Sequence, residues 1–429
     1  MGRTYLSRAR SARRGATGAV LWSGLALVAA CKTTTTPPPI ADTQGDDASG
    51  TTDDRDATTV TTTNEASTSA QDDAGAAVDT GTVTCIANLT DDPKNCGYCG
   101  HSCQGGTCTA GLCPAAQIAQ ATNGSVQGIA VDDTHVFWTS PSGGIFDRAL
   151  GGTAMTGVLP QTPNPYAIAV TATNLFWTDL STQSVYEEVN PDNSSGSTFV
   201  WSLAPDGSVG AAKPVAIAVD VPQSPDAGGG AMSNVYWVDA ELGTVNQAPQ
   251  AGGNVIVLAR NQAQPQAIAV DLDHVYWVNG GSGGIGTVNS VPIGGGTVTT
   301  LATGQSKPVG IAVDPSYTHI YWISGVNAHD QPSVSSVLSL AIGAPPGTPP
   351  TVLASGYGSP MGIAVDDEYV YWTNYTDGTV VKTRTSGEGA PYTLASGSTN
   401  CNNPAAIVVK DNTVYWANQG NGTIFKVPN

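Results

Sequence analysis

The chain has 429 residues, with 16 Lys and Arg residues against 34 Asp and Glu residues, and its formal net charge is −18 at pH 7. A chain this acidic is repelled by nucleic acid and by anionic lipid, which excludes both as direct partners. Its composition changes sharply along its length and divides it into four segments.

Residues 1–30 have the pattern of an export signal. Five arginines precede the apolar run AVLWSGLALVAA, which is too short to span a bilayer and ends in small residues. Together with Cys31 the run ends in VAAC, which resembles a bacterial lipobox. The resemblance implies cleavage before Cys31, a diacylglycerol on its sulfur and, because Lys32 follows, sorting to the outer membrane. The alternative is an ordinary export signal followed by an incidental cysteine.

Residues 31–84 are predicted to be a disordered tether. They are rich in Thr, Ser, Ala, Asp and Pro, and ten carboxylates oppose only Lys32 and Arg55. Such a segment buries too little apolar surface to offset the entropy lost on ordering. Repulsion between its like charges favours an extended spacer.

Residues 85–113 are predicted to be a small disulfide-rich module. In an exported protein, closely spaced cysteines between glycines indicate disulfides, and six cysteines allow fifteen connectivities. The alternative is a zinc site that uses Cys96, Cys99 and the nearby His101. The string DPKNCGYCGHSC resembles short cysteine motifs of secreted proteins from Gram-negative soil bacteria, a resemblance that implies no activity. The six cysteines are Cys85, Cys96, Cys99, Cys103, Cys108 and Cys113. Cys401 is left over and is predicted to be a buried free thiol.

Residues 114–429 contain a string that occurs seven times: IAV, or IVV in the last unit, followed several residues later by an aromatic residue and Trp. Successive tryptophans are 39 to 60 residues apart, and the longest step contains the inserted loop VPQSPDAGGGAMS. Repeats near 40 residues, each divisible into four short strands, are typical of propeller blades. The sequence therefore predicts an all-β fold, a seven-bladed β-propeller, whose repeated tryptophans form the core. The seven are Trp138, Trp177, Trp237, Trp277, Trp322, Trp372 and Trp416.

The last repeat ends after its third strand, at Asn429. Residues 115–121 read AAQIAQA and are similar in kind to the fourth strands of other repeats. We therefore expect Ala115 to Ala121 to pair with Ile424 to Val427 and to close the ring.

The strings VFWTS, LFWTD, VYWVD, VYWVN, IYWIS, VYWTN and VYWAN resemble the YWTD repeats of propellers of the low-density-lipoprotein-receptor type. They also resemble related bacterial propellers of unknown function and the NHL class. The resemblance implies the fold and leaves the function open, because propellers serve binding, scaffolding and catalysis alike. Receptor propellers commonly have six blades, so their contacts are not carried over to this chain.

A candidate ligand-binding rim follows from the residue two positions after each repeated tryptophan. Asp and Asn offer acceptors for a glycan, a peptide or a cation on the upper face. The alternative is that they only cap turns, as Asp and Asn often do. The seven rim positions are Ser140, Asp179, Asp239, Asn279, Ser324, Asn374 and Asn418.

Catalytic signals are few. His135, His274 and His319 each precede a repeated tryptophan by three residues, which predicts separate turn positions on the opposite face. His329, beside Asp330, is the one weak candidate for a general base. The sequence has no P-loop and no His-Glu-x-x-His motif, so we expect no cofactor beyond a cation on the upper face.

These segments together predict a lipoprotein of the bacterial cell envelope, anchored through Cys31. Its propeller is expected to be a non-catalytic platform for a protein or a glycan. Two alternatives stay open at this point. One is a metal-dependent enzyme similar to the seven-bladed streptogramin lyases, which use a metal ion and an upper-face histidine. The other is a structural spacer or adhesin.

Overall fold

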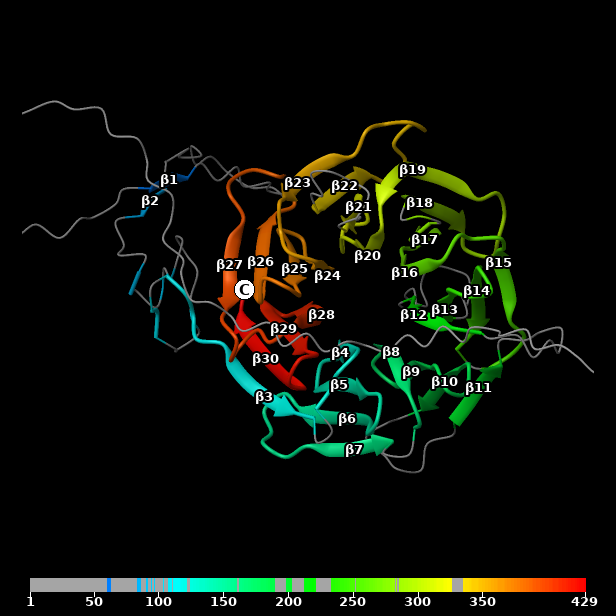
Figure 1. Ribbon diagram of the computed structural model, residues 1–429, viewed down its shortest axis with the longest axis horizontal. Coiled ribbons are helices and arrows are strands. Elements are labelled where there is room, and N and C mark those ends of the chain that lie inside the picture. Colours follow the sequence, from blue (N-terminus) through cyan, green and yellow to red (C-terminus); the bar gives the residue numbers. More distant parts are fainter. Residues whose placement is uncertain are drawn as a thin grey trace, which may run out of the picture. The chain divides into compact units, whose positions relative to one another are not determined.

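The computed structural model describes most of the chain from Thr107 onward (Figure 1). The described ranges are 107–109, 111–121, 124–159, 162–189, 198–202, 212–220, 233–250, 252–281, 285–325 and 335–429, with residues 60–62, 83–85, 90, 91, 94, 96, 103 and 283. The predicted signal, the lipid site Cys31 and Cys99 lie outside the described residues. No helix among the described residues is long and apolar enough to cross a membrane.

Seven four-stranded antiparallel sheets form the fold and confirm the seven-bladed propeller. Six of these sheets run in chain order from an inner first strand to an outer fourth strand, the seventh takes β3 as its outer strand, and the inner strands surround the centre of the ring (Figure 1). The described residues contain no helix.

The blades have the following bounds. Blade 1 contains β4 (Ile129–Val131), β5 (His135–Ser140), β6 (Gly144–Ala149) and β7 (Thr156–Leu159). Blade 2 contains β8 (Pro165–Val170), β9 (Asn174–Asp179), β10 (Ser184–Val189) and β11 (Thr198–Ser202). Blade 3 contains β12 (Pro214–Val219), β13 (Asn234–Asp239), β14 (Thr244–Pro249) and β15 (Ile256–Ala259). Blade 4 contains β16 (Pro265–Val270), β17 (His274–Asn279), β18 (Ile285–Pro292) and β19 (Thr299–Ser306).

Blade 5 contains β20 (Pro308–Val313), β21 (His319–Ser324), β22 (Ser336–Ala341) and β23 (Thr351–Ser355). Blade 6 contains β24 (Pro360–Val365), β25 (Tyr369–Asn374), β26 (Thr379–Arg384) and β27 (Tyr392–Ser396). Blade 7 contains β28 (Pro404–Lys410), β29 (Thr413–Asn418), β30 (Thr423–Pro428) and β3 (Ala116–Gln120).

The predicted closing strand is confirmed. β3 lies antiparallel to β30, with Ala116 opposite Lys426 and Gln120 opposite Thr423 (Figure 1). The ladder joins the N-terminal side of the propeller to its last blade, so blade 7 obtains its fourth strand from about 300 residues earlier in the sequence. Ring closure therefore depends on β3, which reaches β30 only when the intervening blades have folded.

The repeated tryptophans form the core between blades, as predicted. All seven are at most 1% exposed. Each packs beside the aromatic residue that precedes the tryptophan of the previous blade: Trp277 shares a cluster with Tyr236, and Trp138 shares one with Tyr415 across the closure. Side chains alternate between the two faces of a strand, so the aromatic residue and its neighbouring Trp point to opposite blades. One dipeptide thus links three consecutive blades.

Aspartates hold the turns between the first and second strands. Oδ1 of Asp271 accepts hydrogen bonds from the amides of Asp273 and His274, at 2.7 and 2.6 Å. Its Oδ2 accepts a bond of 2.7 Å from the buried hydroxyl of Tyr276. One carboxylate therefore ends the turn and also satisfies the polar end of a core side chain, which a buried tyrosine requires.

Among the described residues of the cysteine module, Cys96 is bonded to Cys108 and Cys103 to Cys113. The sulfur of Cys96 is therefore bonded to Cys108 and is not a thiolate ligand, which removes it from the zinc alternative. The predicted free thiol Cys401 is confirmed and is 2% exposed.

A short ladder interrupts the segment that the sequence predicts as tether. β1 (Val60–Thr62) pairs antiparallel with β2 (Val83–Cys85). Both strands consist mainly of β-branched Val and Thr, which favour extended pairing even where the surrounding composition is polar.

We expect Trp322→Ala to lower the free energy of unfolding by about 3–5 kcal/mol, because it leaves a cavity between blades 4 and 5. Chemical denaturation followed by circular dichroism measures this. Tyr317→Ala in the same blade is the control: Tyr317 is 38% exposed, so the loss is expected to stay below about 0.5 kcal/mol. Equal losses in the two variants would contradict the role assigned to the repeated tryptophan.

Candidate binding surfaces

The seven rim positions lie at the ends of the second strands, next to the turns that lead to the third strands. We call this end of the blades the upper face and the end with the turns between first and second strands the lower face. All seven rim side chains are at most 8% exposed. Direct ligand binding through these side chains stays a prediction. Because they are buried, most of them form hydrogen bonds within the protein.

Asp179 and Asp239 cap upper turns in adjacent blades. Oδ1 of Asp239 accepts from the amides of Glu241 and Leu242, at 3.0 and 2.7 Å, and Oδ2 accepts from the amide of Lys213 at 2.9 Å. Asp179 makes the equivalent three bonds to its own turn and to the loop before its blade. Burial raises the pKa of Asp239. Both carboxylates thus tie a loop between blades to a turn within a blade.

Two of the three rim asparagines, Asn279 and Asn418, position loops between blades, whereas Asn374 donates to Thr379 within its own blade. Nδ2 of Asn418 and Nε1 of Trp416 both donate to the carbonyl oxygen of Asn400, at 2.8 and 2.9 Å. In blade 4, Asn279 and Trp277 donate in the same way to the side chain of Gln262. In blades 4 and 7 the Trp and Asn of the repeated string therefore hold the same upper loop together.

The described histidines lie on the lower face, where the sequence analysis expected them. His135, His274 and His319 begin the second strands of blades 1, 4 and 5. Nδ1 of His135 lies 2.8 Å from the hydroxyl of Thr134, and Nε2 lies 3.6 Å from the carboxylate of Asp147. The candidate base His329 lies outside the described residues.

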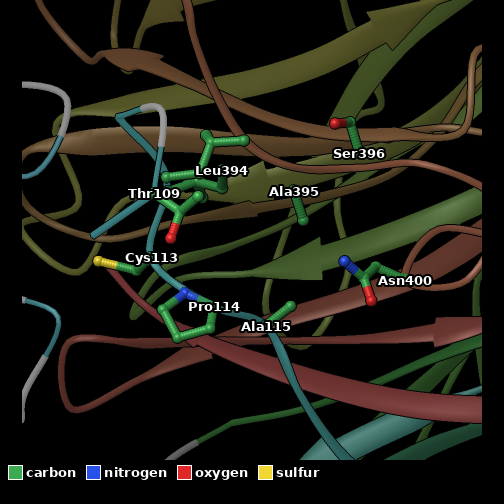
Figure 2. Close-up of a pocket in the computed structure, with 9 residues that line it drawn as sticks. Thr109, Cys113, Pro114, Ala115, Leu394, Ala395, Ser396 and Asn400 are labelled. Carbon is green, nitrogen blue, oxygen red and sulfur yellow. The ribbon is translucent and has the colours of Figure 1, made fainter. Parts of the chain in front are cut away.

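A cavity of about 160 Å³ lies between the cysteine module and blade 6 (Figure 2). The module supplies one wall, and β27 with the loop after it supplies the other. Its polar groups are the Thr109 and Ser396 hydroxyls and the Asn400 amide, and no lining side chain is ionisable apart from Cys113, which is held in a disulfide. The cavity is lined by Thr109, Leu112, Cys113, Pro114, Ala115, Leu394, Ala395, Ser396 and Asn400.

Sequence reasoning did not find this cavity. Asn400 lies in a loop outside the repeated string, and the opposite wall comes from a segment some 280 residues earlier. The one available signal was indirect: the predicted rim residue Asn418 donates to the carbonyl of Asn400 and so positions the cavity wall.

A second set of neutral side chains lies at or just before the start of the first strand of each blade. The second residue of most inner strands is partly exposed, and Met361 reaches 38%. Gln127 accepts a hydrogen bond of 2.6 Å from Gln419, which joins blades 1 and 7. None of the seven residues at this level is charged. They are Gln127, Tyr166, Val215, Gln266, Val309, Met361 and Ala405.

Two buried ionisable side chains were also missed from the sequence. Glu187 on β10 is fully buried, accepts a hydrogen bond from Asn174 through Oε1, and has no hydrogen-bond partner at Oε2. Burial raises its pKa to about 7. Lys382 on β26 is 1% exposed, with Nζ 4.0 Å from the centre of the Tyr369 ring, and burial lowers its pKa to about 7. Neither side chain lines the cavity.

The sequence matches no protein-family model and no curated protein. Among solved structures, virginiamycin B lyase from Staphylococcus aureus matches with a TM-score of 0.57 and 12% identity over 74% of this chain and 99% of that chain. A streptogramin B lyase gives 0.56 and 11% over 73% and 97%. Hydrazine synthase from Kuenenia stuttgartiensis gives 0.55 and 13% over 72% and 97%. At these identities the likeness shows that the chain shares the propeller fold.

We expect Asp239→Ala to lower the free energy of unfolding by about 1–2 kcal/mol, because three backbone amides lose their acceptor. Urea denaturation measures the change. The neighbouring exposed residue provides the control Glu241→Ala, which is expected to change stability by less than about 0.5 kcal/mol. An unchanged stability of Asp239→Ala would show that the caps are dispensable.

Glu187→Gln is expected to stabilise the protein at neutral pH. The folded pKa lies above the ordinary value of 4.5, so ionisation opposes folding. The wild type is therefore penalised increasingly as pH rises from about 4.5 to 7, and by a constant amount above pH 7. Denaturation at pH 4.5 and pH 8 should show a gain of about 2–3 kcal/mol for the variant at pH 8 relative to pH 4.5.

The exposed Glu388→Gln serves as the matched control and is expected to show no such pH dependence. A pH-independent difference for Glu187→Gln would mean that its carboxyl ionises normally in the folded protein.

Proposed function

We propose that this protein is a lipoprotein of the bacterial cell envelope and that its propeller is a non-catalytic platform for an uncharged group of a protein or glycan. The observation that carries the proposal is the chemistry of the cavity in Figure 2. Its hydroxyl, amide and aliphatic walls supply hydrogen bonds and apolar contact. The lining residues include no free acid or base that could transfer a proton or activate the Thr109 or Ser396 hydroxyl as a nucleophile.

The acidic composition supports attachment by lipid rather than by charge. Each lysine or arginine near an anionic surface contributes attraction, whereas this chain carries a net charge of −18. A diacylglycerol on Cys31 would supply two acyl chains, which is enough for stable anchoring. Residues 31–84 would then separate the propeller from the membrane, because a charged linker repels itself and extends.

The enzyme alternative has support from the fold alone. Enzymes of the streptogramin-lyase type use an upper-face histidine and a metal ion, and this chain matches them in its number of blades. Within the described ranges, the histidines lie on the lower face and in separate blades. The upper-face carboxylates of Asp179 and Asp239 each already accept three backbone bonds and are buried, so they do not fit a shared cation.

A retention experiment tests the proposed cavity. The full chain is immobilised and exposed to detergent-solubilised envelope from its own host, and retained proteins and glycans are identified by mass spectrometry. Ser396→Trp at the exposed end of β27 fills the cavity, and Ser355→Trp at the equivalent end of β23 is the matched control. We expect Ser396→Trp to reduce retention at least tenfold, which corresponds to about 1.4 kcal/mol, and Ser355→Trp to retain the wild-type level.

Equal retention by both variants would place the ligand elsewhere on the propeller. No retention by the wild type would count against a binding platform. Turnover of a streptogramin B by the purified chain that is lost on chelation would replace the proposal with the enzyme alternative.

A further inference from the structure

The closing strand buries little of its own surface. Within β3, only Ala119 is buried; Ala116, Gln117 and Gln120 are exposed, and Ile118 is partly exposed. The pairing with β30 also shifts register between Gln117 and Ala119. A short edge strand with so little apolar contact contributes weakly to its own attachment.

The cysteine module is attached to the same place. Cys113 lies three residues before β3 and is bonded to Cys103. The four cysteines of the two disulfides are at most 6% exposed and belong to the apolar cluster that contains Leu394 of blade 6 and Trp416 of blade 7. The module therefore packs where the last two blades meet.

A hydrogen bond fixes the module to blade 6. The hydroxyl of Tyr392, at the start of β27, donates to the carbonyl oxygen of Gly111. Figure 2 shows Cys113, Pro114 and Ala115 running past Leu394 and Ala395 on the way to β3. The chain therefore reaches the closing strand from a module that its disulfides close on itself, and that the buried cluster and this hydrogen bond hold against blade 6.

We propose that the cysteine module is a latch that keeps β3 in place, that the Cys103–Cys113 disulfide holds the module in the shape that packs on blade 6, and that cleavage of this disulfide releases β3 and opens blade 7. A dithiol reductant cleaves the bond by transferring two electrons and two protons, which gives two thiols on the protein and the cyclic disulfide of the reductant. Release leaves β30 as an unpaired edge. The inference concerns ring closure and does not rest on the proposed ligand.

The two disulfides provide their own matched control. Cys103–Cys113 spans 10 residues and Cys96–Cys108 spans 12, so loss of either relieves a similar constraint on the unfolded chain. Only the first is adjacent to β3. Amide hydrogen exchange is measured on the full chain, on Cys103→Ser with Cys113→Ser, and on Cys96→Ser with Cys108→Ser.

We expect the Cys103/Cys113 variant to exchange the amides of β3 and β30 at least tenfold faster than the Cys96/Cys108 variant, with the strands of blade 4 unchanged. Equal exchange of β3 in the two variants would overturn the latch. Should the first variant fail to fold, the wild type is followed during reduction by dithiothreitol: β3 must lose protection before β16, and simultaneous loss overturns the proposal.

Cys401 supplies an independent readout. It is 2% exposed in the same apolar cluster, and burial raises its pKa to about 12, so iodoacetamide should not label it in the native chain. In the Cys103/Cys113 variant we expect its labelling, quantified on the Cys401 peptide, to rise at least tenfold. Labelling as slow as in the wild type would show that the module stays in place without its disulfide.

Discussion

The contact on which the structure depends is the packing of each repeated tryptophan against the aromatic residue of the preceding blade. Trp277 beside Tyr236 and Trp138 beside Tyr415 are two instances of it, and the second spans the closure of the ring. A blade presents one half of this contact on each face, so it cannot bury its own core. The stability of each blade therefore depends on the closed ring, and the closing strand β3, which buries little of its own surface, is the weak point.

The repeated polar residues serve the same packing. On the lower face Asp271 ends a turn and accepts from the hydroxyl of Tyr276, and on the upper face Asn418 and Trp416 hold the loop at Asn400. A polar residue that recurs in most blades is thus explained by the turn or loop that it holds in each of them. Function is better sought where the repetition fails, as it does at the Asn400 loop and at the cysteine module.

This distinction also explains what could be predicted from the sequence. The blades and the closing strand were predictable because a strand of period two and a repeat near 40 residues are local patterns. The burial of Asp239 was not, because spacing places a residue at the end of a strand but does not decide which loop covers it. The cavity at Ser396 was also out of reach, since its second wall comes from the cysteine module. Glu187 was missed because a charged residue in an alternating strand ordinarily faces solvent.

The places where repetition fails coincide in space. The closing strand, the disulfides and the cavity all lie around blades 6 and 7, where Cys113 and Ala115 line the cavity and lead into β3. A ring of equivalent blades offers a ligand seven similar surfaces, whereas this junction occurs once in the described propeller. A specific partner needs a surface that differs from its neighbours, because discrimination is a difference between affinities. The junction that closes the ring is therefore where the proposed ligand would meet a surface unlike those of the other blades.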